Sequence, residues 1–168
     1  MKALLLAAGE GTRLRPLTAT VPKCLVPING RPLLDIWLEQ LTENGIDEIL
    51  INTCYLAEQV EQYVESSKYK KFVTLVYERE LKGTAGTLFA NSEWLEGQPF
   101  VFAHADNLCH FDFQAFLSSH QVRPSVAVGT MMTFETESPR SCGIVELAEN
   151  GLVRDFHEKV DHSPGNLA

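Results

Sequence analysis

The sequence has no long apolar run, few cysteines and a shortage of basic residues. No stretch reaches the roughly 18 consecutive apolar residues of a membrane-spanning helix, so we expect no membrane partner. Cys24, Cys54, Cys109 and Cys142 show no metal-site spacing, and nothing indicates secretion, which predicts reduced thiols and a cytoplasmic location. Lys and Arg number 14 against 22 Asp and Glu, for a net charge of −8. An acidic chain without a broad basic face is not expected to bind nucleic acid.

Internal repeats and low-complexity linkers are also missing, and 168 residues is a length at which one domain buries a sizeable core. Apolar, strand-like runs alternate with helical patterns. We predict strands at residues 2–7, 48–52, 72–77, 100–104 and 125–134, helices at 32–44, 57–66, 84–94 and 113–120, and a hairpin pairing 142–147 with 152–157. In the first helix, Leu34, Leu38 and Leu41 share one face. The alternation predicts an α/β fold with a mainly parallel sheet covered by helices on both faces.

The first predicted strand runs directly into a glycine-rich, basic loop. Glycines such as Gly9 and Gly11 let the backbone approach a phosphate closely, with successive N–H groups pointing at it. Four basic residues and one acidic residue lie between positions 9 and 31, so the local charge is +3 and favours a small anionic ligand. Alone, the loop could also be a solvated surface turn. It is not a dinucleotide-binding fingerprint, because Leu14 occupies the position of the third glycine.

An acidic residue follows another buried strand. Asp106 ends the apolar run of residues 99–106, where a carboxylate is costly unless it binds a metal or meets hydrogen-bond donors. Ligands of parallel sheets bind at the carboxyl ends of the strands, so we expect Gly9 and Asp106 to lie close together. The alternative is that Asp106 caps the next helix.

Two segments resemble the sugar-nucleotide pyrophosphorylases, or nucleotidyltransferases. Residues 6–18 match the family signature L-A-A-G-x-G-T-R-L-x-P-L-T, and residues 22–33 match P-K-x-L-x-P-x-x-G-x-P-L, at every fixed position. The resemblance implies a Rossmann-like three-layer sandwich of the nucleotide-diphospho-sugar transferase type. It also implies an enzyme that transfers a nucleotidyl group from a nucleoside triphosphate to a sugar 1-phosphate and releases pyrophosphate.

The resemblance implies a role for each residue of these segments. Arg13 matches the arginine that faces the triphosphate, and Lys23 matches the lysine beside the reacting phosphates, so both are the predicted catalytic residues. Asp106 aligns with the aspartate of the family's N-G-D, which holds Mg²⁺, although His104 and Ala105 replace the first two residues. The cofactor implied is Mg²⁺. The implied nucleotide contacts in this region are Leu6, Ala8, Gly9, Gly11 and Thr12.

Residues 77–86, Y-E-R-E-L-K-G-T-A-G, resemble the family's base-reading loop, with Lys82 in place of a leucine. The resemblance places Glu78, Gly83 and Thr84 at the nucleotide. A carboxylate only accepts hydrogen bonds, and guanine offers two adjacent donors whereas uracil and thymine offer one, so Glu78 favours GTP. The alternative is a solvated glutamate on a charged loop.

Two segments resemble the family's sugar site. Residues 142–145, C-G-I-V, resemble Y-G-V-V, and residues 156–160, F-H-E-K-V, resemble F-x-E-K-P. The resemblance implies that Gly143 lets the sugar approach, that Glu158 binds sugar hydroxyls and that Lys159 binds the sugar phosphate. Val160 replaces the family's proline.

The resemblance ends before two residues that the family supplies later, a sugar-binding asparagine and a second aspartate for Mg²⁺. We therefore interpret residues 1–168 as a nucleotidyltransferase domain truncated on its C-terminal side, most similar to the guanylyltransferase branch acting on mannose 1-phosphate. The relatives often form homo-oligomers through the part that follows. The alternative function is a non-catalytic subunit of the same fold that senses a nucleotide or nucleotide-sugar.

Overall fold

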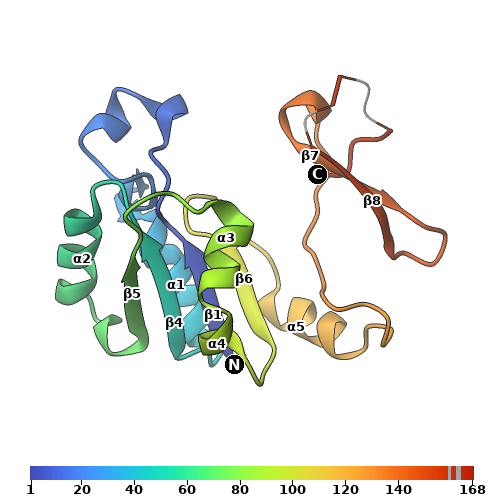
Figure 1. Cartoon of the computed structure of the whole chain (residues 1–168), viewed down its shortest axis with the longest axis horizontal. Helices are drawn as coiled ribbons and strands as arrows, with labels where there is room; N and C mark the ends of the chain where they lie inside the picture. The colour runs from blue at the N-terminus through green and yellow to red at the C-terminus, as the bar shows by residue number, and fades with distance from the viewer. Residues whose placement is uncertain (159, 162–163) are drawn as a thin grey trace. The chain divides into compact units, whose positions relative to one another are not determined.

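The computed structural model describes residues 1–158, 160–161 and 164–168, and it divides into two compact units (Figure 1). Unit 1 comprises Met1–Phe111 and unit 2 comprises Asp112–Ala168. Each unit has its own sheet, and each is described by itself below. Among the described residues, no helix is both long and apolar enough to span a membrane.

Unit 1 is built on a four-stranded parallel sheet. Its strands follow the order β5-β4-β1-β6 and are β1 (Lys2–Leu6), β4 (Glu48–Thr53), β5 (Val73–Tyr77) and β6 (Phe100–His104). The centre of β1 is fully buried, with Leu4 opposite Leu50 on one neighbour and Phe102 on the other. A central parallel strand is covered on both faces, which is why β1 reads as a continuous apolar run.

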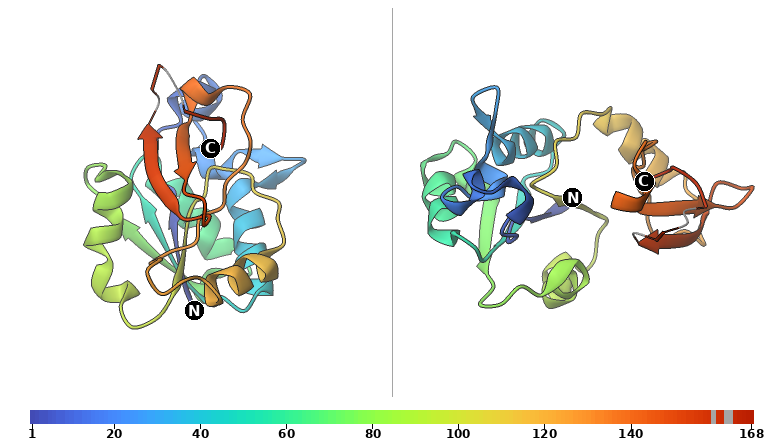
Figure 2. Two further views of the ribbon diagram at one scale, coloured as in Figure 1. Left: turned by 90° about the vertical axis from the view of Figure 1, so that its right-hand side faces the viewer. Right: turned by 90° about the horizontal axis from the view of Figure 1, so that it is seen from above.

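Helices cover both faces of this sheet. They are α1 (Leu33–Glu43), α2 (Ala57–Ser66), α3 (Gly83–Ala90) and the short α4 (Ser92–Leu95). Figure 1 shows α3 in front of the sheet and α1 behind it, and the view from above in Figure 2 places these two helices on opposite sides. The predicted three-layer α/β architecture is therefore confirmed.

Two features of the helices bear on the predictions. Leu34, Leu38 and Leu41 of α1 are all fully buried, which confirms the predicted apolar face. The single helix predicted at residues 84–94 is wrong, because the chain leaves the helical conformation at Asn91. There the side-chain amide donates to the carbonyl of Thr87 at 2.8 Å and ends α3.

Short elements make up the rest of unit 1. The loop after β1 folds into three 3-10 turns and a small antiparallel ribbon before α1 begins. These are Thr12–Leu14, Leu17–Ala19 and Lys23–Leu25, then β2 (Pro27–Ile28) paired with β3 (Arg31–Pro32); a fourth 3-10 turn, Lys70–Phe72, precedes β5.

Unit 2 contains helix α5 (Phe113–Gln121), a 3-10 turn (Pro139–Ser141) and the hairpin of β7 (Gly143–Leu147) and β8 (Val153–Glu158). The hairpin confirms the predicted turn, in which Gly151 has φ of +77° and donates to the carbonyl of Ala148 at 2.9 Å. A left-handed residue suits glycine because it lacks Cβ.

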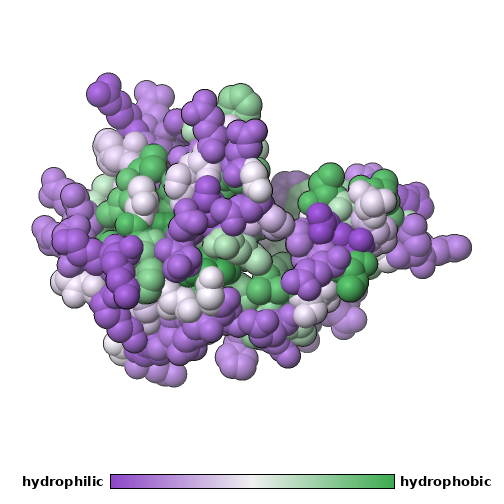
Figure 3. Space-filling view, turned by 90° about the horizontal axis from the view of Figure 1, so that it is seen from below, coloured by the Kyte–Doolittle hydropathy of each residue, from purple (hydrophilic) through white to green (hydrophobic). Residues whose placement is uncertain are grey.

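The strand predicted at residues 125–134 is wrong. Within the described residues this segment forms no strand, and pairing begins only at Phe134, which exchanges two 2.8 Å hydrogen bonds with Ala168. Val126 and Val128 are 73% and 97% exposed. On the face drawn in Figure 3, green apolar side chains lie at the surface among purple polar ones. β-propensity reflects packing on a pleated, half-buried surface, and no strand among the described residues lies beside this segment to supply one.

Substituting the centre of the α1 face should test the core directly. Leu38 is fully buried, so L38A should lower the free energy of unfolding by about 2–5 kcal/mol through lost burial and a residual cavity. The control E43A changes an exposed position of the same helix and should cost less than about 0.5 kcal/mol. Urea denaturation followed by circular dichroism measures both. Equal stability of L38A and E43A would contradict the assigned core.

Candidate functional site

The loop after β1 is held in a shape that requires glycine. Gly11 has φ of +63°, and a Cβ at this position would lie 3.0 Å from the Cβ of Lys23 and 3.0 Å from the Cγ2 of Thr18. Thr18 is fully buried, and its hydroxyl donates to the Gly11 carbonyl at 2.8 Å. Backbone conformation and close packing thus both exclude a larger residue at position 11.

Lys23 is fixed through its neighbour in the sequence. Cys24 is 1% exposed, and its burial raises the pKa of the thiol to about 12, so it remains a neutral, packed side chain. The 3-10 turn of Lys23–Leu25 buries Cys24 and leaves the Lys23 side chain partly exposed. The lysine ammonium can then reach across to the end of another strand.

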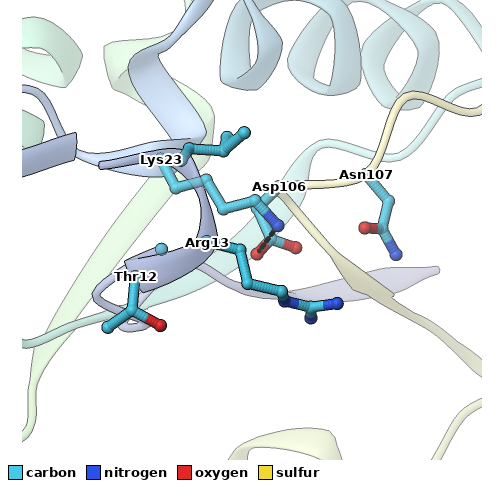
Figure 4. Close-up of a pocket in the computed structure, with 7 residues that line it drawn as sticks. Thr12, Arg13, Lys23, Asp106 and Asn107 are labelled. Atoms are coloured by element: carbon cyan, nitrogen blue, oxygen red, sulfur yellow. Dashed lines mark hydrogen bonds and ion pairs between the residues drawn. The ribbon is translucent and has the colours of Figure 1, made fainter. Parts of the chain in front are cut away.

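Lys23 and Asp106 form an ion pair at the carboxyl ends of β1 and β6. The Nζ of Lys23 donates to the Oδ2 of Asp106 at 2.7 Å, and each side chain is about one quarter exposed (Figure 4). The backbone N–H of Ala105 donates to the carbonyl of Leu6 at 2.9 Å, which continues the pairing of the two strands to their ends. Asp106 thus lies against the segment that follows β1, through Lys23 and, in the same pocket, Gly11; the predicted closeness of Gly9 stays a prediction.

These residues line one pocket in unit 1. Figure 4 shows Lys23 extending to Asp106, the Arg13 side chain running past this pair, and Asn107 on the other side of Asp106. Asn107 is positioned from α1, because the indole N–H of Trp37 donates to its carbonyl at 2.8 Å. The full lining is Gly11, Thr12, Arg13, Leu14, Lys23, Asp106 and Asn107. Two cations against one carboxylate make it suitable for an anion.

The two arginines of the loop differ. Arg15 is exposed and forms an ion pair with Glu10 at 3.0 Å, as a solvated surface turn would have it. Arg13 lines the pocket instead, and it forms no ion pair with any carboxylate of the described residues. Arg13 is therefore the arginine whose charge is available to a ligand.

Asp106 suits a magnesium ion that is bound mainly by phosphates. Within the described part of the chain, no three His, Cys, Asp or Glu side chains gather into a metal-binding group. Mg²⁺ commonly takes one or two carboxylates and fills its other positions with phosphate oxygens and water, which a single aspartate satisfies. The helix-capping alternative is wrong, because Asp112 caps α5 by accepting from the N–H of Ala115 at 2.9 Å.

Glu78 is buried rather than solvated. Its side chain follows β5 and is only 3% exposed, so the alternative of a solvated glutamate is wrong. Its Oε1 accepts from the hydroxyl of Thr87 at 2.6 Å, and its backbone N–H donates to the carbonyl of Thr53 at 2.8 Å. Four residues farther along, Lys82 donates its backbone N–H to Oε2 at 3.4 Å.

The other predicted nucleotide contacts lie in unit 1 along the same strand ends. Leu6 ends β1, and Ala8 is buried just beyond it. Gly83, with φ of +71°, begins α3 and is followed by Thr84, and no atom lies within 4 Å of the position where a Cβ on Gly83 would be.

The predicted sugar residues belong to unit 2. Gly143 and Glu158 are directly opposite each other in the β7–β8 register. A Cβ on Gly143 would lie 2.2 Å from the Cζ of Phe156 and 2.9 Å from the Oε2 of Glu158. The hairpin thus brings the glycine and the glutamate together and requires the glycine for packing. Lys159 lies outside the described residues.

The sequence reasoning did not single out four residues that shape these sites. Thr18 supports the loop and Asn107 lines the pocket, and both are adjacent to or within recognised motifs. Asn52 is a polar residue near the end of an otherwise apolar strand, which is a readable signal. Thr87 carries no such signal, because a threonine in a short helix is unremarkable in sequence.

A parallel α/β sheet with a cationic, glycine-bordered pocket at the ends of its strands is an arrangement suited to phosphate groups. The chain belongs to the nucleotidyl transferase family, whose model matches residues 2–168. The resemblance to nucleotidyltransferases is thereby confirmed.

Three similar proteins place the chain within this family. It is 35% identical over 162 residues to the mannose-1-phosphate guanylyltransferase catalytic subunit beta of Drosophila pseudoobscura pseudoobscura, covering 94% of this chain and 43% of that protein. It is 32% identical over 171 residues to the UTP–glucose-1-phosphate uridylyltransferase of a Synechocystis strain, covering 95% and 44%. A crystal structure of a UDP-glucose pyrophosphorylase complexed with UDP-glucose matches with a TM-score of 0.81 and 25% identity, covering 99% of this chain and 72% of that one. The chain spans less than half the length of the two curated relatives.

The two glycines of the loop should respond differently to alanine. G11A introduces a Cβ at positive φ against Lys23 and Thr18 and should lower the free energy of unfolding by about 1–3 kcal/mol. Gly9 has no atom within 4 Å of its Cβ position, so G9A should unfold like the wild type. Urea denaturation of both variants measures this difference. A G11A variant as stable as G9A would show that the loop is not held as described.

Proposed function

We propose that this chain is the nucleotide-binding part of a sugar-1-phosphate nucleotidyltransferase. The reaction would transfer a nucleotidyl group from a nucleoside triphosphate to a hexose 1-phosphate and release pyrophosphate. The observation that carries the proposal is the pocket lined by Arg13, Lys23 and Asp106 at the carboxyl ends of two parallel strands, in which Lys23 pairs with Asp106 and Arg13 does not. Family membership and the names of the relatives support the same reaction class.

The side chains of the pocket suit a displacement between two anions. A sugar-phosphate oxygen attacks the α-phosphate, so charge repulsion is a large part of the barrier, and cations that position both reactants lower it. Arg13 would contact the triphosphate and stabilise the departing pyrophosphate. Lys23 would hold its ammonium beside the reacting phosphates from its place at Asp106. Mg²⁺, held by Asp106 and the phosphates, would add positive charge beside the reacting phosphate groups.

We propose GTP as the nucleotide and mannose 1-phosphate as the first sugar to test. The buried Glu78 carboxylate presents only acceptors, and guanine has two adjacent donors. The similar proteins include one named for a guanylyl transfer and one for a uridylyl transfer, so base preference is decided by experiment. Gly143, Glu158 and Lys159 are the proposed sugar-phosphate residues.

A second candidate function is a non-catalytic subunit that senses a nucleotide or nucleotide-sugar. One observation favours it: among the described residues, Asp106 belongs to no group of three His, Cys, Asp or Glu side chains that could hold a metal ion. A sensor needs phosphate contacts but no complete metal site, whereas catalysis needs the metal fixed against the attacking oxygen.

Calorimetric titration with GTP, UTP, dTTP, CTP and ATP, each with and without Mg²⁺, tests the nucleotide site. We expect at least one Mg²⁺-dependent ligand, with GTP bound most tightly. The same titration with inosine triphosphate, which lacks the N2 amino donor, tests whether both guanine donors are read. A folded chain that binds none of these nucleotides would refute the proposed function.

The two arginines of the loop form a matched pair for the phosphate contact. R13A should weaken GTP binding by about 10-fold or more, because it removes charge-assisted hydrogen bonds to the triphosphate. R15A removes an arginine that is exposed and paired with Glu10, so its affinity should stay within about threefold of the wild type. Calorimetry measures both. Equal losses in the two variants would contradict the distinct role of Arg13.

Catalysis is tested by pyrophosphate release with GTP and mannose 1-phosphate. We expect very slow turnover by the 168-residue chain and robust turnover by a polypeptide extended to the length of the curated relatives. In the extended polypeptide, D106A should abolish turnover. D112A, which removes only the α5 cap, should cost about 1 kcal/mol of stability and leave the rate unchanged. An inactive extended polypeptide that still binds nucleotide would favour the sensing function.

A further inference from the structure

Three buried polar side chains form a hydrogen-bonded network at the strand ends of unit 1. Asn52 of β4, Thr87 of α3 and Glu78 after β5 are 3%, 1% and 3% exposed. Asn52 contacts the backbone at Ala7, directly before the glycine-rich loop, and Glu78 lies at the other end of this network. The hydrogen-bonded network therefore connects the start of the predicted phosphate loop with the predicted base-reading residue.

Each hydrogen bond of this network has only one possible donor and one possible acceptor. The backbone N–H of Ala7 donates to the Oδ1 of Asn52 at 2.9 Å, which orients the amide, because a flipped amide would set two donors against each other. The Nδ2 of Asn52 therefore donates to the Oγ1 of Thr87 at 3.2 Å. With that donor in place, the Thr87 hydroxyl donates its own proton to the Oε1 of Glu78 at 2.6 Å.

A fixed donor at Thr87 dictates what residue 78 can present on that side. The atom of residue 78 that faces Thr87 must be an acceptor, as the Oε1 of Glu78 is. A glutamine at position 78 would keep its oxygen toward Thr87 and direct its amino group the other way. The chemical identity of residue 78 would then appear entirely at its second terminal atom. In Glu78 this atom is the acceptor Oε2, which also takes a long, 3.4 Å hydrogen bond from the backbone N–H of Lys82 and has a second lone pair for a ligand.

We propose that Thr87, oriented by Asn52, is a positioning residue for nucleotide selectivity: it locks the side chain of residue 78 so that Glu78 presents an acceptor to the base. This inference rests on the proposed function, in which Glu78 reads the base edge. With Oε1 held by Thr87, the remaining Oε2 can accept from both adjacent N–H groups of guanine. Uracil offers this oxygen one N–H, flanked by two carbonyl oxygens that repel it. Neither Thr87 nor Asn52 needs to touch the nucleotide for this effect.

A merely structural role for Thr87 makes a different prediction. The hydroxyl satisfies a buried carboxylate and a buried amide, so its loss lowers stability in either case. A structural role would leave the ratio of the affinities for GTP and UTP unchanged in the folded variant. The positioning role changes that ratio, because an unlocked side chain no longer holds its acceptor toward the base.

The test compares the GTP and UTP dissociation constants of wild type, T87V, T87S and E78Q by calorimetry, with folding checked by circular dichroism. T87V should reduce the preference for GTP over UTP by about 10-fold, and E78Q should shift the ratio in the same direction. T87S keeps a hydroxyl and should keep the wild-type ratio. T42V is the matched control, because the Thr42 hydroxyl donates to the Leu38 carbonyl, away from Glu78, and its ratio should be unchanged.

The double variant T87V/E78Q adds an internal check. In the T87V background the glutamine amide can turn either way, so E78Q should shift the ratio less than it does in the wild type. If T87V does not fold, T87A replaces it. A water molecule in the vacated space can keep Asn52 hydrogen-bonded, but it is not held by covalent bonds and so does not fix the Glu78 carboxylate as the hydroxyl does. We expect T87A to shift the ratio in the same direction as T87V.

The outcomes separate the inference from the proposed function. If E78Q changes the ratio while folded T87V or T87A keeps the wild-type value, Glu78 reads the base and Thr87 is only structural, so the inference fails alone. If wild type binds nucleotides but E78Q leaves the ratio unchanged, the base-reading role of Glu78 and the inference fail together. If folded wild type binds no nucleotide, the proposed function itself fails.

Discussion

The parallel pairing of β1 with β4 and β6 is the constraint on which the site depends. Parallel strands bring their carboxyl ends to one edge, so the loop after β1 and the acid after β6 meet although 83 positions separate Lys23 from Asp106. The hydrogen bond from Ala105 to Leu6 carries this pairing to the ends of the strands. The ion pair of Lys23 and Asp106 at 2.7 Å is a consequence of that register. A one-residue slip would turn every side chain of β1 to the opposite face.

Around this edge, the backbone and a few buried side chains hold the charged groups in place. Thr18 and the small volume of Gly11 let the loop close on itself, and buried Cys24 anchors the turn that carries Lys23. Asn52 orients Thr87, and the Thr87 hydroxyl holds the Glu78 carboxylate by a hydrogen bond. Neutral, buried groups thus hold charged side chains in place, which is how a site stays preorganised without a bound ligand.

The errors of sequence reasoning share one physical origin. Residues 125–134 have the composition of a strand but find no neighbouring strand among the described residues, and Val128 is 97% exposed. Glu78 has a charged-loop sequence around it, yet it is buried because α3 packs Thr87 against it. Asn91 divides a helix whose periodicity continues past it. In each case a particular hydrogen bond or packing contact, or its absence, overrides the preference that the sequence pattern indicates.

The sequence by itself determined the family, the parallel α/β class and most of the pocket. A buried strand running into glycines and arginines, with an acid after another strand, is a local pattern whose meaning depends little on the rest of the chain. Only the tertiary structure decided that Arg13 lines the pocket while Arg15 pairs with Glu10, and that a directed hydrogen-bond chain reaches Glu78 through Thr87. Hydrogen-bond direction and burial arise from contacts across strands and helices, and spacing along one chain does not encode them.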